Sequence, residues 1–241
     1  MSKFFENFPA VRYSFGNRLA PVTFQDLSVY IDLIDILKSN LSYYRTLNIL
    51  EGDRPDQLSL KLYGETDYHW TFFLMNDNLR ENGWPLSELQ LKELAAEQYP
   101  NTVLTTRDEL TNIFLVGQTV TGSRSGSTGT IIHRNLDLGQ IYIQGTQSFF
   151  NSEEITSQVG DEVQSVTLVG AVDEKNAIAF YRDSNLKIRD ITPFGPPSVD
   201  LTPVTYIEYL REKNEEQKTI NVIKPSIIED VFRQYQQELL A

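Results

Sequence analysis

The spacing of apolar residues changes several times along the chain, and each spacing predicts a different element. Residues 23–41 carry apolar side chains at helical spacing, with Thr23 in position to cap a helix. Residues 44–50, YRTLNIL, alternate in part and are rich in residues that favour strands. The pattern therefore predicts a helix and then a strand, before the chain turns at Glu51 and Gly52.

A short helix is expected directly after this turn. Asp53 is in position to cap it, because its carboxylate can accept backbone N–H groups, and Pro55 is tolerated in a first turn. Leu58 and Leu62 are spaced so that they share one helix face. Gly64 can end the helix by taking the left-handed terminal conformation.

Two further helices are expected at short intervals. Thr66 is in position to cap the first of them and Asn76 to end it. The apolar residues expected on its shared face are Trp70, Phe73 and Leu74. The second begins at Ser87, after a break that contains Gly83 and Pro85. Its apolar side is expected to consist of Leu89, Leu91, Leu94, Ala95 and Tyr99.

The character of the sequence changes at about residue 110, where glycines begin to recur among short runs of strand-forming residues. These runs are IFLV, QTVT, TIIH, IYIQG and SVTLVGAV, all within residues 110–172. Several short strands with closely spaced turns predict a small β-barrel or sandwich.

Residues 173–218 are expected to contain a hairpin, a linker and a charged segment. The runs NAIAFYRD and LKIRDI predict the hairpin. The Pro-rich stretch TPFGPPSVDLTP leaves no room for regular structure. Residues 206–218 are expected to form a charged helix or loop.

A strand and a helix are expected to end the chain. TINVIKP predicts a strand that stops at Pro225, and Ser226 with Glu229 matches a capping box at the start of a helix. The apolar stripe of this helix consists of Ile227, Ile228, Val231, Phe232, Tyr235 and Leu239.

These elements predict an α+β protein in four parts. An N-terminal aromatic arm and helix occupy residues 1–42, and a β-α-α unit with the following helix occupies residues 43–100. A small Gly-rich β-domain spans residues 101–172, and the hairpin, linker and C-terminal strand-helix span residues 173–241. The aromatic arm is expected to lie extended along a surface, either that of its own domain or that of a partner protein.

Composition narrows the possible functions. The formal net charge is −12 and no basic cluster is present, which argues against nucleic-acid binding because phosphate contacts need clustered Lys and Arg. The sequence has no cysteine, so disulfides and thiolate sites are excluded. The N-terminus, MSKFFENFPAV, does not match a secretory signal, and no apolar run is long enough for a membrane span. A soluble protein made in a cytoplasm is expected.

No arrangement of residues predicts catalysis or a metal site. The two histidines, His69 and His133, are far apart in sequence, and neither has a ligand at helical spacing. The stretch GSRSGSTG fits neither a nucleophile elbow nor a phosphate loop, and a hairpin tip explains it better. The pairs Glu153–Glu154 and Glu215–Glu216 are expected in polar surroundings rather than buried. We therefore expect no enzyme activity and no cofactor.

The stretch GDRPDQLSLKLYG, followed by a Trp and then an Asn, resembles a LysM module, which is a small β-α-α-β fold. Gly52 and Asp53 match the Gly-Asp turn of that family. Trp70, Phe73 and Asn76 match the Trp, apolar and Asn positions of its second helix. Two features differ: Arg54-Pro55 replaces the usual Thr-Leu of the glycan-facing turn, and no closing strand is evident directly after Asn76.

A wider resemblance covers about residues 1–100 and 218–241. The aromatic arm, the helix, the stretch from YRTLNILEGDRP to MNDN, GWPLS and the ending INVIKPSIIEDVFRQYQQEL together resemble the LysM-like wedge subunits of T4-like bacteriophage baseplates. The Gly-rich centre resembles small β-modules of tail proteins, and it is interpreted as an insertion relative to shorter members of this family.

This resemblance implies a structural role rather than catalysis. Such subunits join baseplate wedges around the central hub, so the expected location is the virion tail baseplate, assembled in the host bacterial cytoplasm. The expected partners are other wedge subunits, adjacent wedges and also hub or sheath-initiating tail proteins, with no nucleic acid and no membrane. The interface candidates are Phe4, Phe5, Phe8, Tyr13, Gly52, Arg54, Tyr68, Trp84, Phe232 and Tyr235. The alternative is a LysM-type protein that binds peptidoglycan or chitin.

Overall fold

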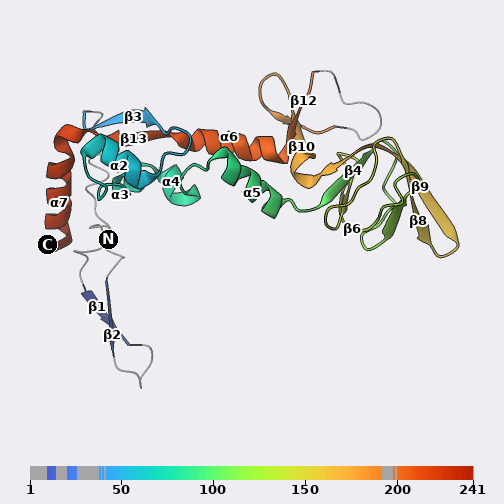
Figure 1. Cartoon of the computed structure of the whole chain (residues 1–241), viewed down its shortest axis with the longest axis horizontal. Coiled ribbons are helices and arrows are strands. Elements are labelled where there is room, and N and C mark those ends of the chain that lie inside the picture. Colours follow the sequence, from blue (N-terminus) through green and yellow to red (C-terminus); the bar gives the residue numbers. More distant parts are fainter. Residues whose placement is uncertain are drawn as a thin grey trace. The chain divides into compact units, whose positions relative to one another are not determined.

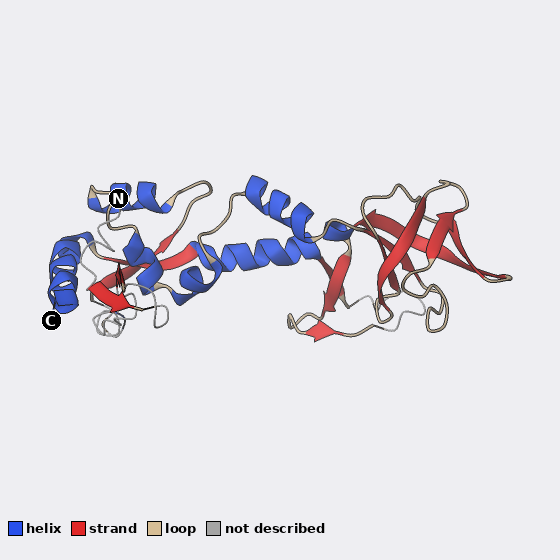
Figure 2. Cartoon of the chain, turned by 90° about the horizontal axis from the view of Figure 1, so that it is seen from below, coloured by secondary structure: helices blue, strands red, loops and turns tan. Residues whose placement is uncertain are grey.

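The computed structural model describes residues 10–14, 21–25, 38, 40, 42–191, 198 and 200–240, and it divides the chain into two compact units. The first unit combines residues 1–87 with residues 214–241, and the second consists of residues 88–213. The chain therefore leaves the first unit after Ser87 and returns to it after Lys213. Helices and antiparallel sheets occur together (Figures 1 and 2), which confirms the predicted α+β class.

The first unit is built on a two-stranded sheet whose strands lie far apart in the sequence. Strand β3 (Tyr44–Asn48) is followed by the helices α2 (Pro55–Tyr63), α3 (Trp70–Met75) and α4 (Asp77–Asn82). Strand β13 (Thr219–Ile223) then pairs antiparallel with β3, with Thr219 opposite Asn48 and Ile223 opposite Tyr44. A one-turn η3 (Pro225–Ile227) and helix α7 (Ile228–Leu240) end the chain.

Two clusters of buried side chains hold this unit together. One joins Ile49, Leu58, Phe72, Leu79, Ile220 and Val222, with Leu62 and Trp84 packed against it. The other joins Trp70, Met75, Ile223, Ile228 and Val231, with Tyr68 and Phe232 at its side. Because β13 contributes to both clusters, the C-terminal segment is part of the core of this unit.

Some helix ends follow the sequence prediction and others do not. Gly64 ends α2 in the left-handed region, with a φ of 78°, and its N–H bonds to the carbonyl of Leu60, as predicted. The second helix begins at Trp70 rather than after Thr66, because a turn occupies the residues between them. At the C-terminus Ser226 lies inside η3, so the predicted capping box does not start the helix. Helix α4 was not predicted at all.

The N-terminal region contains a β-hairpin within the described residues. Strand β1 (Ala10–Tyr13) pairs antiparallel with β2 (Val22–Gln25). The prediction of a helix from residue 23 is wrong at its start, because Thr23 pairs with Arg12 in this hairpin. Most of the predicted helix lies outside the described residues, as do Phe4, Phe5 and Phe8.

The centre of the second unit is a closed β-barrel (Figure 2), which confirms the predicted small all-β domain. Its strands follow the order β4-β7-β6-β5-β8-β9 around the barrel. Their bounds are β4 (Thr102–Thr106), β5 (Thr119–Gly122), β6 (Thr128–Asn135), β7 (Gln140–Ile143), β8 (Glu154–Val159) and β9 (Glu162–Asp173). The interior is filled by apolar side chains that include Leu104, Phe114, Ile131, Ile143 and Leu168.

Two parts of the barrel differ from the prediction. The run IFLV is not a strand, because it lies in the connection between β4 and β5, where Phe114 has a φ of 53°. The Phe114 ring is nonetheless completely buried, so this connection contributes to the barrel interior. Strands β4 and β8 were not recognised as strands in the sequence.

Close packing at Gly129 gives a first testable prediction. A Cβ atom at Gly129 would overlap the Cγ2 atom of Ile143, whose side chain is completely buried in the barrel. Changing Gly129 to Ala should therefore lower the free energy of unfolding of the barrel by about 1–3 kcal/mol, the usual cost of overpacking. Chemical denaturation followed by far-UV circular dichroism measures the effect.

Gly170 provides the matched control for that substitution. It also lies in a barrel strand, but a Cβ atom there would meet nothing within 4 Å. We expect Gly170→Ala to change stability by less than about 0.5 kcal/mol, as for other substitutions that disturb no packing. If the two variants lose the same amount of stability, the close approach of Ile143 to Gly129 is not the cause of the loss.

Helices and a small sheet flank the barrel within the second unit. Helix α5 (Glu88–Gln98) precedes it, and η2 (Glu174–Asn176) follows. Strand β10 (Ile178–Arg182) pairs with β11 (Ile188–Arg189), which confirms the predicted hairpin, and with β12 (Thr202–Thr205). The end of the Pro-rich stretch is therefore a strand rather than a linker. Leu89 does not join the apolar side of α5, since it is 68% exposed.

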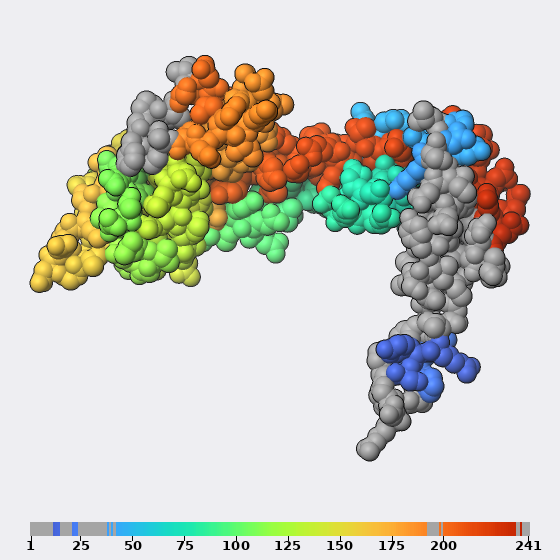
Figure 3. Space-filling model, turned by 180° about the vertical axis from the view of Figure 1, so that it is seen from behind, coloured from blue at the N-terminus to red at the C-terminus, as the bar shows by residue number. Residues whose placement is uncertain are grey.

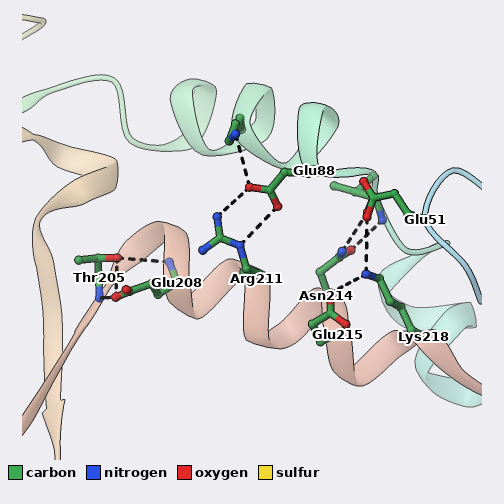
Figure 4. Close-up of polar contacts among 10 residues, drawn as sticks. Glu51, Glu88, Thr205, Glu208, Arg211, Asn214, Glu215 and Lys218 are labelled. Atoms are coloured by element: carbon green, nitrogen blue, oxygen red, sulfur yellow. Dashed lines mark hydrogen bonds and ion pairs between the residues drawn. The ribbon is translucent and has the colours of Figure 1, made fainter. Parts of the chain in front are cut away.

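Helix α6 (Tyr206–Lys218) begins in the second unit and ends in the first. Its start is a capping box, in which the Thr205 amide and hydroxyl donate to Glu208 Oε2 at 2.8 and 2.9 Å (Figure 4). Within the second unit, Arg211 Nη2 donates to Glu88 Oε1 at 2.8 Å. Within the first, the buried Asn214 side chain bonds both backbone groups of Leu86 (Figure 4). The charged segment is thus a helix.

Candidate functional site

The turn between β3 and α2 holds two of the predicted interface residues, Gly52 and Arg54, and hydrogen bonds fix its conformation. Gly52 has a φ of 79°, and the Asp53 amide donates to the Leu50 carbonyl at 3.0 Å. The Asp53 carboxylate accepts from Lys61 Nζ at 2.5 Å and from the Leu50 amide at 3.4 Å. It does not cap α2, because Arg54 is the N-cap residue and makes no side-chain capping bond.

Trp84, which follows helix α4, contacts this turn. Its indole Nε1 donates to the Asp53 carbonyl at 2.6 Å. Its ring lies 5.9 Å from the rings of both Phe72 and Phe73, measured between centroids. Trp84 therefore connects the turn to the core of its own unit.

The remaining interface candidates do not converge on one site. Tyr68 and Phe232 pack edge to face, with ring centroids 5.6 Å apart, at the side of the cluster that contains Trp70. Arg54 is exposed and its guanidinium pairs with Asp56. Tyr13 is 58% exposed on β1. Tyr235 lies in α7, where its side chain is outside the described part of the chain.

Asn76 has a role that the sequence did not reveal. Its side-chain amide donates to the Asn221 carbonyl and its Oδ1 accepts from the Asn221 amide, both at 2.8 Å. The same amide nitrogen also donates to the Phe72 carbonyl at 2.8 Å. The sequence predicted that Asn76 ends a helix and matched it to the Asn position of a LysM module, but it did not predict that Asn76 binds both backbone groups of one β13 residue.

Replacing Asn76 with Ala should lower the stability of the first unit by about 2 kcal/mol. The change leaves the amide and carbonyl of Asn221 without their partner, and a buried unpaired polar group costs about 1–3 kcal/mol. Solvent can reach half-buried Asn221 and offset part of this loss. Urea denaturation followed by tryptophan fluorescence reports on this unit, because both tryptophans lie in it.

The control for this prediction is Asn82→Ala. Asn82 also bonds a carbonyl four residues earlier, that of Asn78, but it is exposed and makes no hydrogen bond to a described residue of β13. Its replacement should cost less than about 0.5 kcal/mol. If the two variants unfold at the same urea concentration, the bonds to Asn221 do not stabilise the unit.

Glu153 is completely buried, whereas the sequence predicted that it is not. It lies at the end of the barrel where GSRSGSTG connects β5 to β6. Its Oε2 accepts from the amides of Arg124 and Ser125 at 3.1 and 2.9 Å. Its Oε1 accepts from the Ser125 hydroxyl at 2.9 Å and the Phe150 amide at 2.5 Å.

These bonds determine the charge of Glu153. Burial alone would raise the pKa of the carboxyl group, but the backbone amides of Ser125, Phe150 and Arg124, with the Ser125 hydroxyl, outweigh that effect and lower it. The group is therefore an ionised acceptor at neutral pH. A carboxylate held in this way organises the surrounding loops and is poorly suited to act as a general acid.

The two histidines have ordinary surroundings. His69 Nδ1 lies 2.9 Å from the Thr66 carbonyl, and the His133 ring packs edge to face on Tyr142 at 5.0 Å. In the part of the chain that the structure describes, no three His, Asp or Glu side chains are grouped so that they could hold a metal ion. Among the same residues, no helix is both long and apolar enough to cross a membrane.

A scan against protein-family models found none that fits the chain, and a search of curated proteins found no similar sequence.

Proposed function

We propose that this chain is a structural component of the baseplate wedge of a contractile-tailed bacteriophage, where it joins neighbouring wedges during assembly. One observation carries the proposal. The two stretches that resemble wedge subunits, residues 1–100 and 218–241, are separated by more than a hundred residues. In the fold nearly all of them belong to a single compact unit, and most of the central region forms the other.

The sheet pairing supports the same interpretation. A LysM-like unit needs a second strand to close its β-α-α-β order, and no such strand follows Asn76 in the sequence. Strand β13 supplies it from the C-terminal stretch and pairs with β3 over its full length. In chain order, the central region lies between the helices of the first unit and strand β13, which is where an insertion into such a module would be expected.

The same strand also favours a second candidate function, a LysM-type protein that binds peptidoglycan or chitin. With β13 in place, the unit has the strand that glycan-binding modules require. The conformation of the turn between β3 and α2 argues against this glycan-binding function. Trp84 is bonded to the Asp53 carbonyl, and Arg54, next to Pro55, is paired with Asp56. These features favour a module that contacts protein.

Two measurements in parallel separate the candidates. Purified contractile-tail particles are analysed by mass spectrometry for this chain, and the tagged full chain is tested for sedimentation with cell-wall sacculi and for retention on chitin. We expect the chain in the particles at a constant ratio to other wedge proteins, without retention on either glycan. Sacculus binding by a chain that is absent from particles would overturn the proposal in favour of the glycan-binding candidate.

A further inference from the structure

The pairing of β13 with β3 defines which backbone groups point away from the sheet. The Ile49 amide bonds the Lys218 carbonyl, and the Lys224 amide bonds the Tyr43 carbonyl. In an antiparallel pair, hydrogen-bonded and non-hydrogen-bonded residue pairs alternate. The residues with outward backbone groups are therefore Tyr44, Thr46 and Asn48 on β3, and Thr219, Asn221 and Ile223 on β13.

The outer edge of β13 is closed by side chains of the same unit. Asn76 bonds both the amide and the carbonyl of Asn221. The hydroxyl of Tyr63 donates to the Ile223 carbonyl at 3.0 Å. Burial raises the pKa of Tyr63 to about 12, so this hydroxyl stays protonated and remains a donor at neutral pH. Another strand could pair along this edge only by displacing these side chains.

The outer edge of β3 is open within the described residues. Its outward amides and carbonyls, those of Tyr44, Thr46 and Asn48, bond no described residue across the edge. The strand is regular, with no bulge in its pairing, and its sequence YRTLN contains no proline. Figure 1 shows β3 beside β13, and Figure 3 shows its light-blue segment at the molecular surface.

Such an edge is unusual, because natural proteins commonly protect edge strands with proline, bulges or covering segments. We propose that the outer edge of β3 is a docking site where an extended segment of a neighbouring protein adds as a third strand. This inference rests on the proposed function, since it names the contact that the first unit would make in an assembly. The edge presents alternating donors and acceptors at strand spacing, and an extended polypeptide backbone is the partner that matches them.

The charge on the strand indicates which segment fits best. Arg45 is exposed and makes no ion pair with a described residue. Its side chain lies on the same sheet face as Leu47, since alternate residues share a face. An added strand would place a side chain on that face within reach of the guanidinium. The matching partner is therefore an extended segment with an acidic residue at that position.

Thr46 allows a test that changes the edge with little effect on the fold. Its amide points outward, so Thr46→Pro removes a donor from the open edge and breaks no backbone hydrogen bond to β13. The substitution also removes the hydroxyl, which donates to Asn221 Oδ1 at 3.3 Å. Thr46→Val is the matched control, because it loses the hydroxyl but keeps the amide. Arg45→Glu tests the charge preference separately.

In the experiment, the tagged full chain is used to capture a tail protein that binds to it. This tail protein is then purified and mixed with each variant. We expect Thr46→Pro to raise the Kd by tenfold or more, roughly the effect of one lost backbone hydrogen bond. We expect Thr46→Val to bind with the same Kd as the unchanged chain. Arg45→Glu should also weaken binding. Residue-resolved hydrogen exchange on the unchanged complex should slow at the amides of Tyr44, Thr46 and Asn48.

The outcomes distinguish this inference from the proposed function. Retention of a tail protein with equal affinity for all variants, and without slower exchange at β3, would overturn the edge docking and leave the assembly role standing. Recovery of no tail protein, with binding to sacculi, would overturn both. A dimer of the chain that Thr46→Pro abolishes would show that a second copy occupies the edge, contrary to the proposal. Slower hydrogen exchange at the β3 amides in the unchanged complex would support docking at this edge even if Thr46→Pro fails to fold, and unchanged exchange there would overturn it.

Discussion

Changing Trp70 to Ala is expected to lower the free energy of unfolding of the first unit by about 3–5 kcal/mol. Trp70 is only 7% exposed and lies in a cluster with Ile223, Ile228 and Val231. Its ring is 6.2 Å from that of Phe232, so the substitution removes contacts to β13 and to α7 together. Urea denaturation measures the loss, with the fluorescence of the remaining Trp84 reporting on the same unit.

The result also decides whether Trp70 is a core residue or a contact for a partner. Leu60 is the control, because it is 52% exposed on α2 and its replacement by Ala should cost less than about 1 kcal/mol. A loss for Trp70→Ala as small as the one for Leu60→Ala, accompanied by failure to enter particles, would identify the ring as an exposed contact. That result would contradict the packing described above.

The elements that sequence predicted well are those set by local chemistry. Gly64 ends α2 because only glycine takes the left-handed conformation without cost, and this is visible from the residue itself. The strand TINVIKP was also recognised from its composition. Its pairing with β3 was not, because the periodicity of a strand gives its faces and not its partner.

The barrel shows where residue preference misleads. The run IFLV is rich in strand formers, but Phe114 is held in a turn by the burial of its ring in the barrel interior. Strands β4 and β8, TVLTT and EITSQV, have polar residues at many positions, and some of these are buried by the barrel itself. Strand preference depends on burial against neighbouring strands, which the sequence does not display.

The candidate interface was predicted largely from aromatic residues, and that criterion does not separate contacts from core. Tyr68, Trp84 and Phe232 all pack within their own unit. The residues with the most specific hydrogen bonds, Asn76 and Glu153, were missed because polar side chains are usually exposed. The open edge of β3 follows only from the pairing with β13, since backbone groups leave no mark on the residue pattern.

Changing Glu153 to Ala is expected to cost the barrel about 3 kcal/mol or more. Three backbone amides and the Ser125 hydroxyl lose their acceptor, and each buried donor without a partner costs about 1–3 kcal/mol. The loops at Ser125 and Phe150 should loosen first, because both are held by the same carboxylate. Hydrogen exchange of the barrel amides and far-UV circular dichroism in urea measure local and global losses.

The pH dependence gives an independent check through Glu153→Gln, which keeps the size of the side chain but removes its charge. Because the pKa of Glu153 is lower in the folded protein than its ordinary value of 4.5, the carboxylate stabilises the fold fully above that value. The contribution is lost as the pH falls below 4.5 toward the folded-state pKa. Asp77, Glu88, Asp183 and Glu208 have lowered pKa values too, so the unchanged barrel and the Gln variant must be compared at each pH. The stability difference between them should shrink on acidification, and a difference that stays constant from neutral pH to pH ~3 would mean that the charge of Glu153 does not hold these loops.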